Sequence, residues 1–288
     1  MTQSHSITRT IVVMASLAVV MLALLVACTL VGSVDIPAGE VWSIVTGQGS
    51  ANEAWDIIIL DSRLPMVFTA MLAGAALAIS GLLLQTTFNN PLAGPSILGV
   101  STGAGLGVAI VMLAMGGTVG GLFGQTVGSY IAILVGALLG AGIVLAVLII
   151  FSSIVKNSTV LLIIGILVSY LASSLISLLN SIATEEGITS YVAWGFGTFS
   201  GVTVSQMPVF ASLIVLSLAA SALMVKPLNA MLMGTRYATN MGVDVRRSRN
   251  VLLIITGLLT AVVTAFCGPI GFLGLVVPHV ARLMLGTS

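Results

Sequence analysis

The polar side chains with the clearest spacing in this chain form a row of serines in an otherwise apolar segment. Ser169, Ser173, Ser177 and Ser181 follow one another at intervals of four residues, and Asn180 lies beside them. On a helix this spacing places the side chains along one face. Two roles are open: hydrogen-bonded packing between helices, or an uncharged and mildly polar pathway wall that suits a large solute.

No arrangement of residues typical of a catalytic site is present. The sequence has no Ser–His–Asp set, no paired carboxylates and no histidine cluster, and Cys28 and Cys267 lie far apart in apolar segments. Neither lysine follows a glycine, so the phosphate-binding G-x-x-x-x-G-K-[ST] loop is absent. We therefore predict no enzyme, no cofactor and no metal site. If ATP drives this protein, a separate subunit must bind the nucleotide.

The composition is that of a polytopic, all-α membrane protein in a single domain over residues 1–288. The chain is 58% hydrophobic and 6% charged, against about 25% charged in a typical soluble domain. A membrane span needs about 20 apolar residues. Eight candidate spans cover residues 10–32, 64–86, 96–115, 127–153, 159–183, 206–225, 250–267 and 271–286. Two shorter helices are expected outside the spans, at 38–45 and within 184–205.

The positive charges predict the orientation, because basic loops stay on the cytoplasmic side. With the N-terminus inside and eight crossings, eight of the nine basic residues are cytoplasmic. Asp244 is the only acidic residue on that side. These basic residues are Arg9, Lys156, Lys226, Arg236, Arg246, Arg247, Arg249 and Arg282. Most lie in the polar loop 226–249, which is long enough to form short helices and to offer a surface to a soluble partner.

Arg63 is the one basic residue expected outside, at the mouth of a span. It could anchor the chain at the membrane interface, pair with Asp61, or contact an acidic soluble protein.

Glycines recur at a spacing that favours close helix packing. The segments 99–107 and 136–142 both carry small residues four positions apart, which lets two helices approach closely in a membrane. Two segments also echo each other, since 94–100 and 268–275 both open a span with Gly-Pro. Inverted repeats are common in transporters, so an internal repeat is a further possibility.

Three groups of motifs resemble the FecCD-type permeases, which are the membrane subunits of ABC importers for iron-siderophores, haem and cobalamin. The first covers 63–65, 73–81, Gln85, 90–93 and 98–105; the second covers 228–229, Gly234, Ala238 and 242–243; the third covers 268–282. The resemblance spans essentially the whole chain. It implies a fold of ten helices per subunit, a homodimer, two ATPase subunits docked below and an extracytoplasmic substrate-binding protein above.

The resemblance also implies roles for particular residues. Coupling to the ATPase is expected at Leu228, Asn229, Gly234, Arg236, Ala238, Gly242 and Val243. The cytoplasmic gate is expected at Asn90, Pro91, Leu92, Ser158 and Thr159. The pathway would be lined by Ser169, Ser173, Ser177, Asn180 and Ser181, and Arg63 would contact the binding protein.

The sequence departs from the family pattern in two places. Met66 stands where the family often has the second arginine of Arg-Leu-Pro-Arg, and the chain stops at Ser288 where members continue for two more spans. We therefore expect about eight of ten helices, with the two C-terminal helices missing.

The predicted function is that of an importer permease in a prokaryotic cytoplasmic membrane, with an iron-siderophore favoured over haem or cobalamin as the substrate. A stand-alone secondary carrier or channel is the alternative. The absence of an acidic residue from every predicted span argues against it.

Overall fold

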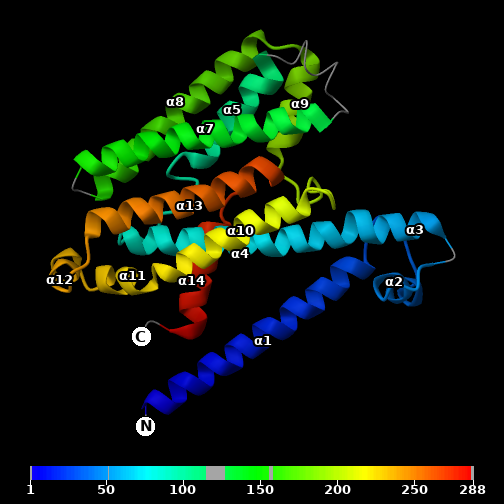
Figure 1. Cartoon of the computed structure of the whole chain (residues 1–288), viewed down its shortest axis with the longest axis horizontal. Helices are drawn as coiled ribbons and strands as arrows, with labels where there is room; N and C mark the ends of the chain where they lie inside the picture. The colour runs from blue at the N-terminus through cyan, green and yellow to red at the C-terminus, as the bar shows by residue number, and fades with distance from the viewer. Residues whose placement is uncertain (1, 51, 115–126, 156–157, 287–288) are drawn as a thin grey trace. The chain divides into compact units, whose positions relative to one another are not determined.

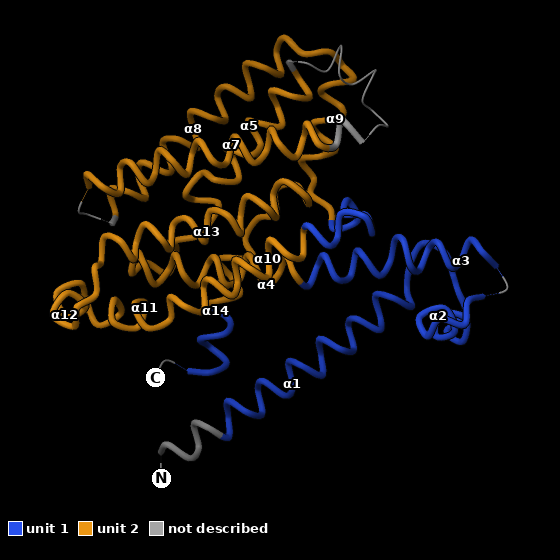
Figure 2. Tube along the Cα trace, in the orientation of Figure 1, with its two compact units in different colours: residues 1–71, 199–209, 279–288 blue, residues 72–198, 210–278 orange. Residues whose placement is uncertain are grey.

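The computed structural model describes residues 2–50, 52–114, 127–155 and 158–286. Within these ranges the chain consists of helices joined by turns, without a β-strand, so the predicted all-α class is confirmed. Lys156, which the charge count uses, lies outside the described residues. The chain divides into two compact units (Figure 2). Unit 1 comprises residues 1–71, 199–209 and 279–288, and unit 2 comprises 72–198 and 210–278.

Unit 1 contains α1 (Thr2–Leu30), α2 (Ala38–Val45), α3 (Glu53–Ile57), the π-helix η1 (Ile58–Arg63) and the start of α4 (Leu64–Thr87). Ile36, Val41, Ile44 and Ile59 form a small buried cluster between these elements. The predicted helix at 38–45 is confirmed as α2.

The loop between the first two predicted spans is shorter than the span bounds 10–32 and 64–86 imply, because the helix of the second span begins at Glu53 rather than at residue 64. Asn52 provides the physical reason. Its side-chain oxygen accepts a hydrogen bond from the backbone N–H of Ala54 at 3.1 Å, which is the N-cap contact that starts a helix. From there the helix is continuous through η1 to Thr87.

Unit 2 contains most of the remaining helices, which Figure 1 labels and Figure 2 colours by unit. They are α5 (Val100–Ala109), the π-helix η2 (Ile110–Ala114), α7 (Val127–Ile154), α8 (Ser158–Ile182), α9 (Glu185–Gly195), α11 (Val225–Leu232), α12 (Thr235–Asn240), α13 (Val245–Cys267) and parts of α10 (Met207–Leu223) and α14 (Leu273–Leu285). The helix predicted within 184–205 corresponds to α9. α5 packs against α7, α8 and α13, and α13 also packs against α7.

Four glycines hold α5 and α7 in backbone contact. A Cβ added at Gly107 would lie 1.9 Å from the carbonyl oxygen of Gly136, and one added at Gly140 would lie 2.1 Å from that of Gly103. Each helix therefore presents two glycines, four residues apart, to the other. The predicted role of this spacing in close helix packing is confirmed.

Five helices are long and apolar enough to cross a membrane, judged by length and composition over the described residues. A sixth span results if α10 and α11, which are bent by 50° at their junction, count as one. The remaining two predicted spans correspond to shorter apolar helices, Val100–Leu113 and Leu273–Leu285. Each of the eight predicted spans thus contains a helix.

Candidate functional site: a hydroxyl-lined cavity and the α11–α12 helix pair

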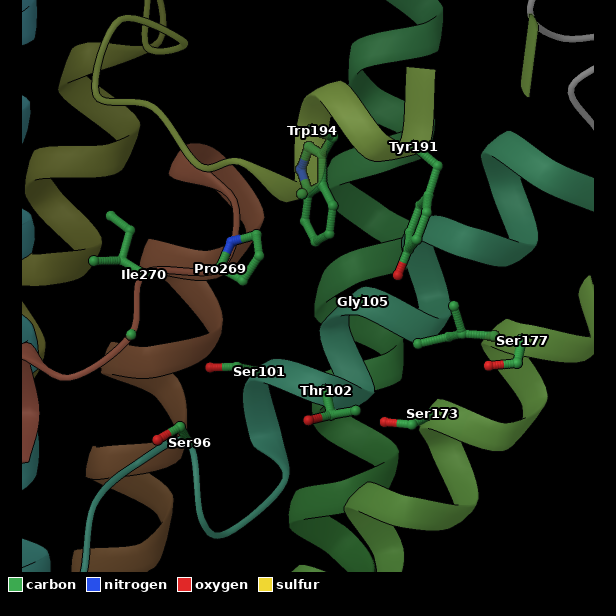
Figure 3. A pocket seen from close by; sticks show the side chains of 13 residues that line it. Ser96, Ser101, Thr102, Gly105, Ser173, Ser177, Tyr191, Trp194, Pro269 and Ile270 are labelled. Atoms are coloured by element: carbon green, nitrogen blue, oxygen red, sulfur yellow. The ribbon is translucent and has the colours of Figure 1, made fainter. Parts of the chain in front are cut away.

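A cavity of about 510 Å³ lies within unit 2, between α5, α8, α9 and the turn that joins α13 to α14 (Figure 3). Five serine and threonine side chains line it: Ser96, Ser101, Thr102, Ser173 and Ser177. No charged residue is among the described residues that form its wall. The described residues of the whole chain also contain no cluster of His, Cys, Asp or Glu that could hold a metal ion. The cavity can therefore donate and accept hydrogen bonds but offers no ionic partner.

The serine row on α8 divides into two kinds of side chain. Ser169 and Ser181 donate to carbonyl oxygens of their own helix, at 2.9 Å to Gly165 and 2.7 Å to Leu178. Ser173 and Ser177 line the cavity, and no partner for either hydroxyl is found among the described residues. The structure thus brings two of the five predicted pathway residues into the cavity. Asn180 does not line it, although its side-chain oxygen is buried without a hydrogen-bond partner in the described part of the chain.

Two aromatic side chains from α9 close the opposite wall. Tyr191 and Trp194 stack with ring centroids 5.9 Å apart and planes inclined by 28°, and both face the hydroxyl side chains across the cavity (Figure 3). Thr184 starts α9 by accepting a hydrogen bond from the N–H of Gly187 at 3.3 Å. Burial raises the pKa of the Tyr191 phenol above its ordinary value of 10.0, so this group stays protonated near neutral pH.

The two Gly-Pro segments noted in the sequence meet beside this cavity. A Cβ at Gly274 would lie 2.8 Å from Cδ of Pro95, and Ser96 and Pro269 both contribute to the wall. Ser101 is held at this junction by a 3.2 Å hydrogen bond with the hydroxyl of Thr264. The contact does not test whether the segments belong to an inverted repeat, and that idea stays a prediction.

The predicted coupling loop folds into α11 and α12, which pack against each other and against α13. Leu228 and Ala238 are buried, whereas Asn229, Gly234, Arg236 and Gly242 are exposed and Val243 is half-buried. Gly234 has φ of +105° and Gly242 has φ of +81°, which is a region that side chains with a Cβ rarely adopt. Of the seven predicted coupling residues, the two buried ones pack inside the loop, four lie on its surface and one is half-buried.

Sequence reasoning missed the apolar residues on this surface. Met233, Tyr237 and Met241 are 70%, 47% and 64% exposed. In the sequence these three residues are separated by mainly small or polar residues. Apolar side chains placed in a polar loop in this way were the available sign of a contact surface. Apolar side chains exposed together outside the spans favour a protein contact.

Arg249 ties this region to the end of α7. Its Nε donates to the Ser152 hydroxyl at 2.9 Å, and its Nη2 donates to the backbone oxygens of Ser152 and Val155, the latter at 3.0 Å. The Ser152 hydroxyl in turn donates to Asn250 at 2.7 Å. Carbonyls at the end of a helix lack partners within it, so the guanidinium satisfies the end of α7 without an acid.

The predicted gate residues lie at two helix ends. Asn90 closes the turn after α4, with its side-chain oxygen accepting from the N–H of Leu92 at 2.9 Å. Pro91 and Leu92 are exposed. Ser158 is the first residue of α8, and Thr159 follows with an exposed side chain. Their role in gating stays a prediction.

Arg63, the predicted contact for a binding protein, is only 4% exposed. Its Nη1 donates to the backbone oxygens of Thr29 at 3.0 Å and Leu30 at 2.8 Å, and its Nη2 donates to that of Val34. The guanidinium thus holds the C-terminal end of α1, a role that differs from the membrane-interface anchor, the pair with Asp61 and the contact with an acidic protein that the sequence left open. Direct contact with a binding protein stays untested.

Comparison with known proteins places the chain in a family. The sequence profile of the FecCD transport family matches residues 18–288. The chain is 34% identical over 280 residues to the ferric enterobactin transport system permease protein FepG of Escherichia coli (strain K12), covering 92% of this chain and 81% of that protein. It is 33% identical to the hemin transport system permease protein HmuU of Yersinia pestis, covering 83% of this chain and 70% of that protein.

Two further similarities agree with these. The vitamin B12 import system permease protein BtuC of Citrobacter koseri is 32% identical, with 94% of this chain and 76% of that protein covered. A solved chain from a metal-chelate type ABC transporter in an inward-facing conformation superposes with a TM-score of 0.79 at 28% identity, covering 96% of this chain and 82% of that chain. The match to the family profile and the identity to these relatives show that the chain belongs to the FecCD transport family.

Proposed function

We propose that this chain is the membrane-spanning permease subunit of an ABC importer that carries an iron-siderophore or a similar metal chelate across a prokaryotic cytoplasmic membrane. The observation that carries the proposal is the uncharged, hydroxyl-lined cavity in a chain that shares its family with FepG, HmuU and BtuC. Such a cavity can hold a large polar solute without binding it tightly. Catalysis belongs to partner ATPase subunits.

The energy input enters at α11 and α12. Their exposed apolar side chains, Met233, Tyr237 and Met241, together with the predicted residues Asn229 and Arg236, would contact the ATPase. Because both helices pack on α13 and Arg249 links α13 to the end of α7, a movement at this surface reaches the start of α8. The 90–92 turn and Thr159 would then open or close the cytoplasmic end of the pathway.

The complete assembly would contain a second copy of this chain, two ATPase subunits and an extracytoplasmic binding protein that selects the substrate. The N-terminus would be cytoplasmic. No particular feature of the described residues favours the stand-alone carrier, and a carrier would not need the exposed apolar surface of α11 and α12.

Co-purification with the candidate ATPase tests this proposal. The Met233→Asp/Met241→Asp variant should lower affinity for the ATPase by about tenfold or more, since charges replace apolar contact residues. Asn240→Asp adds a charge at an exposed polar position of the same helix pair and should change affinity by less than about threefold. Equal loss in both variants, or no ATPase binding by the unaltered chain, would overturn the proposal.

A further inference from the structure

We propose that one face of α13 binds an anionic phospholipid, with the headgroup on Arg246 and Arg247 and one acyl chain along the apolar residues that follow. The site lies at the N-terminal end of α13, where this helix contacts α12 (Figure 1). The inference goes beyond the proposed function, because it requires only that α13 crosses a membrane, for which its length and apolar composition are sufficient.

The first argument is that these two arginines lack a protein partner for their side chains. Both side chains are exposed, and neither is hydrogen-bonded or ion-paired to a described residue. The buried Arg249, in contrast, donates to Ser152 and Val155. The single acid nearby in the sequence is Asp244, which accepts a hydrogen bond from the backbone N–H of Arg247 at 2.9 Å. Positive charge is therefore in excess, and an external anion can balance it.

The second argument is an exposed apolar stripe that runs along α13 from Arg247. Among residues 251–267 of this helix, only three are not buried: Val251 is half-buried, and Ile254 and Leu258 are 46% and 39% exposed. From Arg247 onward these residues follow at intervals of four, three and four, which places them on one helix face. The part of α13 that remains uncovered is thus a narrow strip that begins at a cation.

The third argument is the size of the stripe. Leu258 lies about 16 Å along the helix from Arg247, at 1.5 Å per residue. The hydrocarbon core of a bilayer is about 30 Å thick, so one leaflet is about 15 Å thick. A headgroup at Arg247 therefore places an acyl chain along the whole stripe. A docked protein helix would need a wider apolar face, of about 100°, whereas a single acyl chain fits a strip one side chain wide.

The fourth argument distinguishes anionic lipids from zwitterionic ones. Arg246, Arg247 and Arg249 all lie in the first two turns of α13, where the helix dipole is positive and cations are unfavourable. A headgroup with a net negative charge reduces this repulsion. The ammonium group of a zwitterionic headgroup would instead add a further positive charge beside the arginines.

The test compares two phospholipids that differ only in their headgroups. Phosphatidylglycerol and phosphatidylcholine with the same acyl chains are titrated against the full chain in detergent, and bound lipid is counted by native mass spectrometry. About 0.15 M ammonium acetate screens exposed charges more than about 8 Å apart. We expect phosphatidylglycerol to bind at least about tenfold more tightly, because each arginine near an anionic headgroup favours binding.

Double variants then locate the binding. Arg246→Gln/Arg247→Gln should weaken phosphatidylglycerol binding by about tenfold and leave phosphatidylcholine binding within about twofold. Lys226→Gln/Arg236→Gln removes the same charge from exposed positions on α11 and α12, and it should change either affinity by less than about threefold. Arg246→Lys/Arg247→Lys keeps the charge and should retain phosphatidylglycerol binding within about threefold.

A soluble headgroup separates a lipid site from a simple anion site. Glycerol 3-phosphate carries the phosphate without acyl chains, so it lacks the apolar contact with the stripe. It should displace phosphatidylglycerol only at a concentration at least about a hundredfold higher than that of the lipid. Displacement at a similar concentration would overturn the inference.

Equal binding of the two lipids would also contradict the lipid site, as would an equal loss in the two glutamine double variants. Association of Arg246→Gln/Arg247→Gln with the ATPase is measured without added lipid. A tenfold loss there, with lipid binding unchanged, would assign the arginines to the ATPase and exclude the lipid site. If the unaltered chain binds no ATPase, the proposed function fails, but the lipid measurements still decide this inference.

Discussion

At the scale of single residues, the two buried arginines follow one rule. Arg63 is 4% exposed and Arg249 is 8% exposed, and each donates to carbonyl oxygens at the C-terminal end of another helix, α1 and α7 respectively. These carbonyls lack partners within their own helices and carry partial negative charge. An arginine can therefore be buried without an acidic partner, at a place where it fixes one helix to another.

Arg249→Met should destabilise the protein by about 1–3 kcal/mol, because it leaves carbonyl oxygens of Ser152 and Val155 without their charged donor. The matched control is Arg247→Met, whose side chain is exposed and whose change should stay within about 0.5 kcal/mol. Thermal unfolding in detergent measures both. If the two variants lose the same stability, the link between α13 and α7 does not contribute as described.

The sequence predicted the residues of the cavity only in part. The four-residue spacing on α8 correctly identified one helix face, but it could not separate Ser173 and Ser177 from Ser169 and Ser181. That distinction depends on which neighbour each turn of α8 meets. Ser96, Thr102 and Tyr191 come from distant segments, and nothing in their local sequence indicates a common site.

At the scale of helices, α5 and α7 act as one packed pair. Their four facing glycines bring the backbones into contact, which positions Ser101 and Thr102 at the start of α5 relative to α8 and α9. Small residues serve this purpose in membranes because close approach increases van der Waals contact between helices.

Gly107→Ala should destabilise the protein by about 1–3 kcal/mol, since its methyl group would lie 1.9 Å from the Gly136 oxygen and must push the helices apart. Gly142→Ala is the same change on α7 at an exposed position with no atom within 4 Å, and it should be neutral or stabilising by up to about 1 kcal/mol. Guanidinium or thermal unfolding of both variants distinguishes them. Similar stabilities would contradict the close packing.

Local signals predicted some helix ends and missed others. The bounds of α2 follow from Pro37, which precedes the helix, and from the glycine after it at position 47. The early start at Glu53 was missed because the Asn52 cap is a single residue in a polar loop. The predicted span 271–286 contains the 13-residue α14. The helix starts later than composition predicts because the first residues of that span belong to the turn from Gly268 to Phe272.

At the scale of the whole molecule, the importer mechanism requires that the helix pair α11–α12 lies on one side of the membrane and that α9 lies on the other. Basic residues gather around the first pair, including Arg236, Arg246 and Arg247, and α9 begins with Glu185 and Glu186. This distribution is the basis for proposing a cytoplasmic α11–α12 surface.

Cysteine labelling checks the orientation. In a chain with Cys28 and Cys267 replaced by alanine, Phe196→Cys should react with a membrane-impermeant maleimide in right-side-out vesicles, because Phe196 is 81% exposed beyond α9. Met233→Cys, at a 70% exposed position, should react only after the vesicles are permeabilised. The opposite pattern would place the coupling surface outside and exclude the proposed ATPase contact.

The unpaired hydroxyls and the facing glycines also differ in how freely they can change over evolution. A new side chain at Gly103, Gly107, Gly136 or Gly140 needs a compensating change on the other helix, so these positions can diverge only together. Ser173 and Ser177 have no protein partner among the described residues to lose, so either can be exchanged without disturbing the helix frame. Descendants of this chain could therefore acquire new cargo by single substitutions in the wall while the scaffold stays the same.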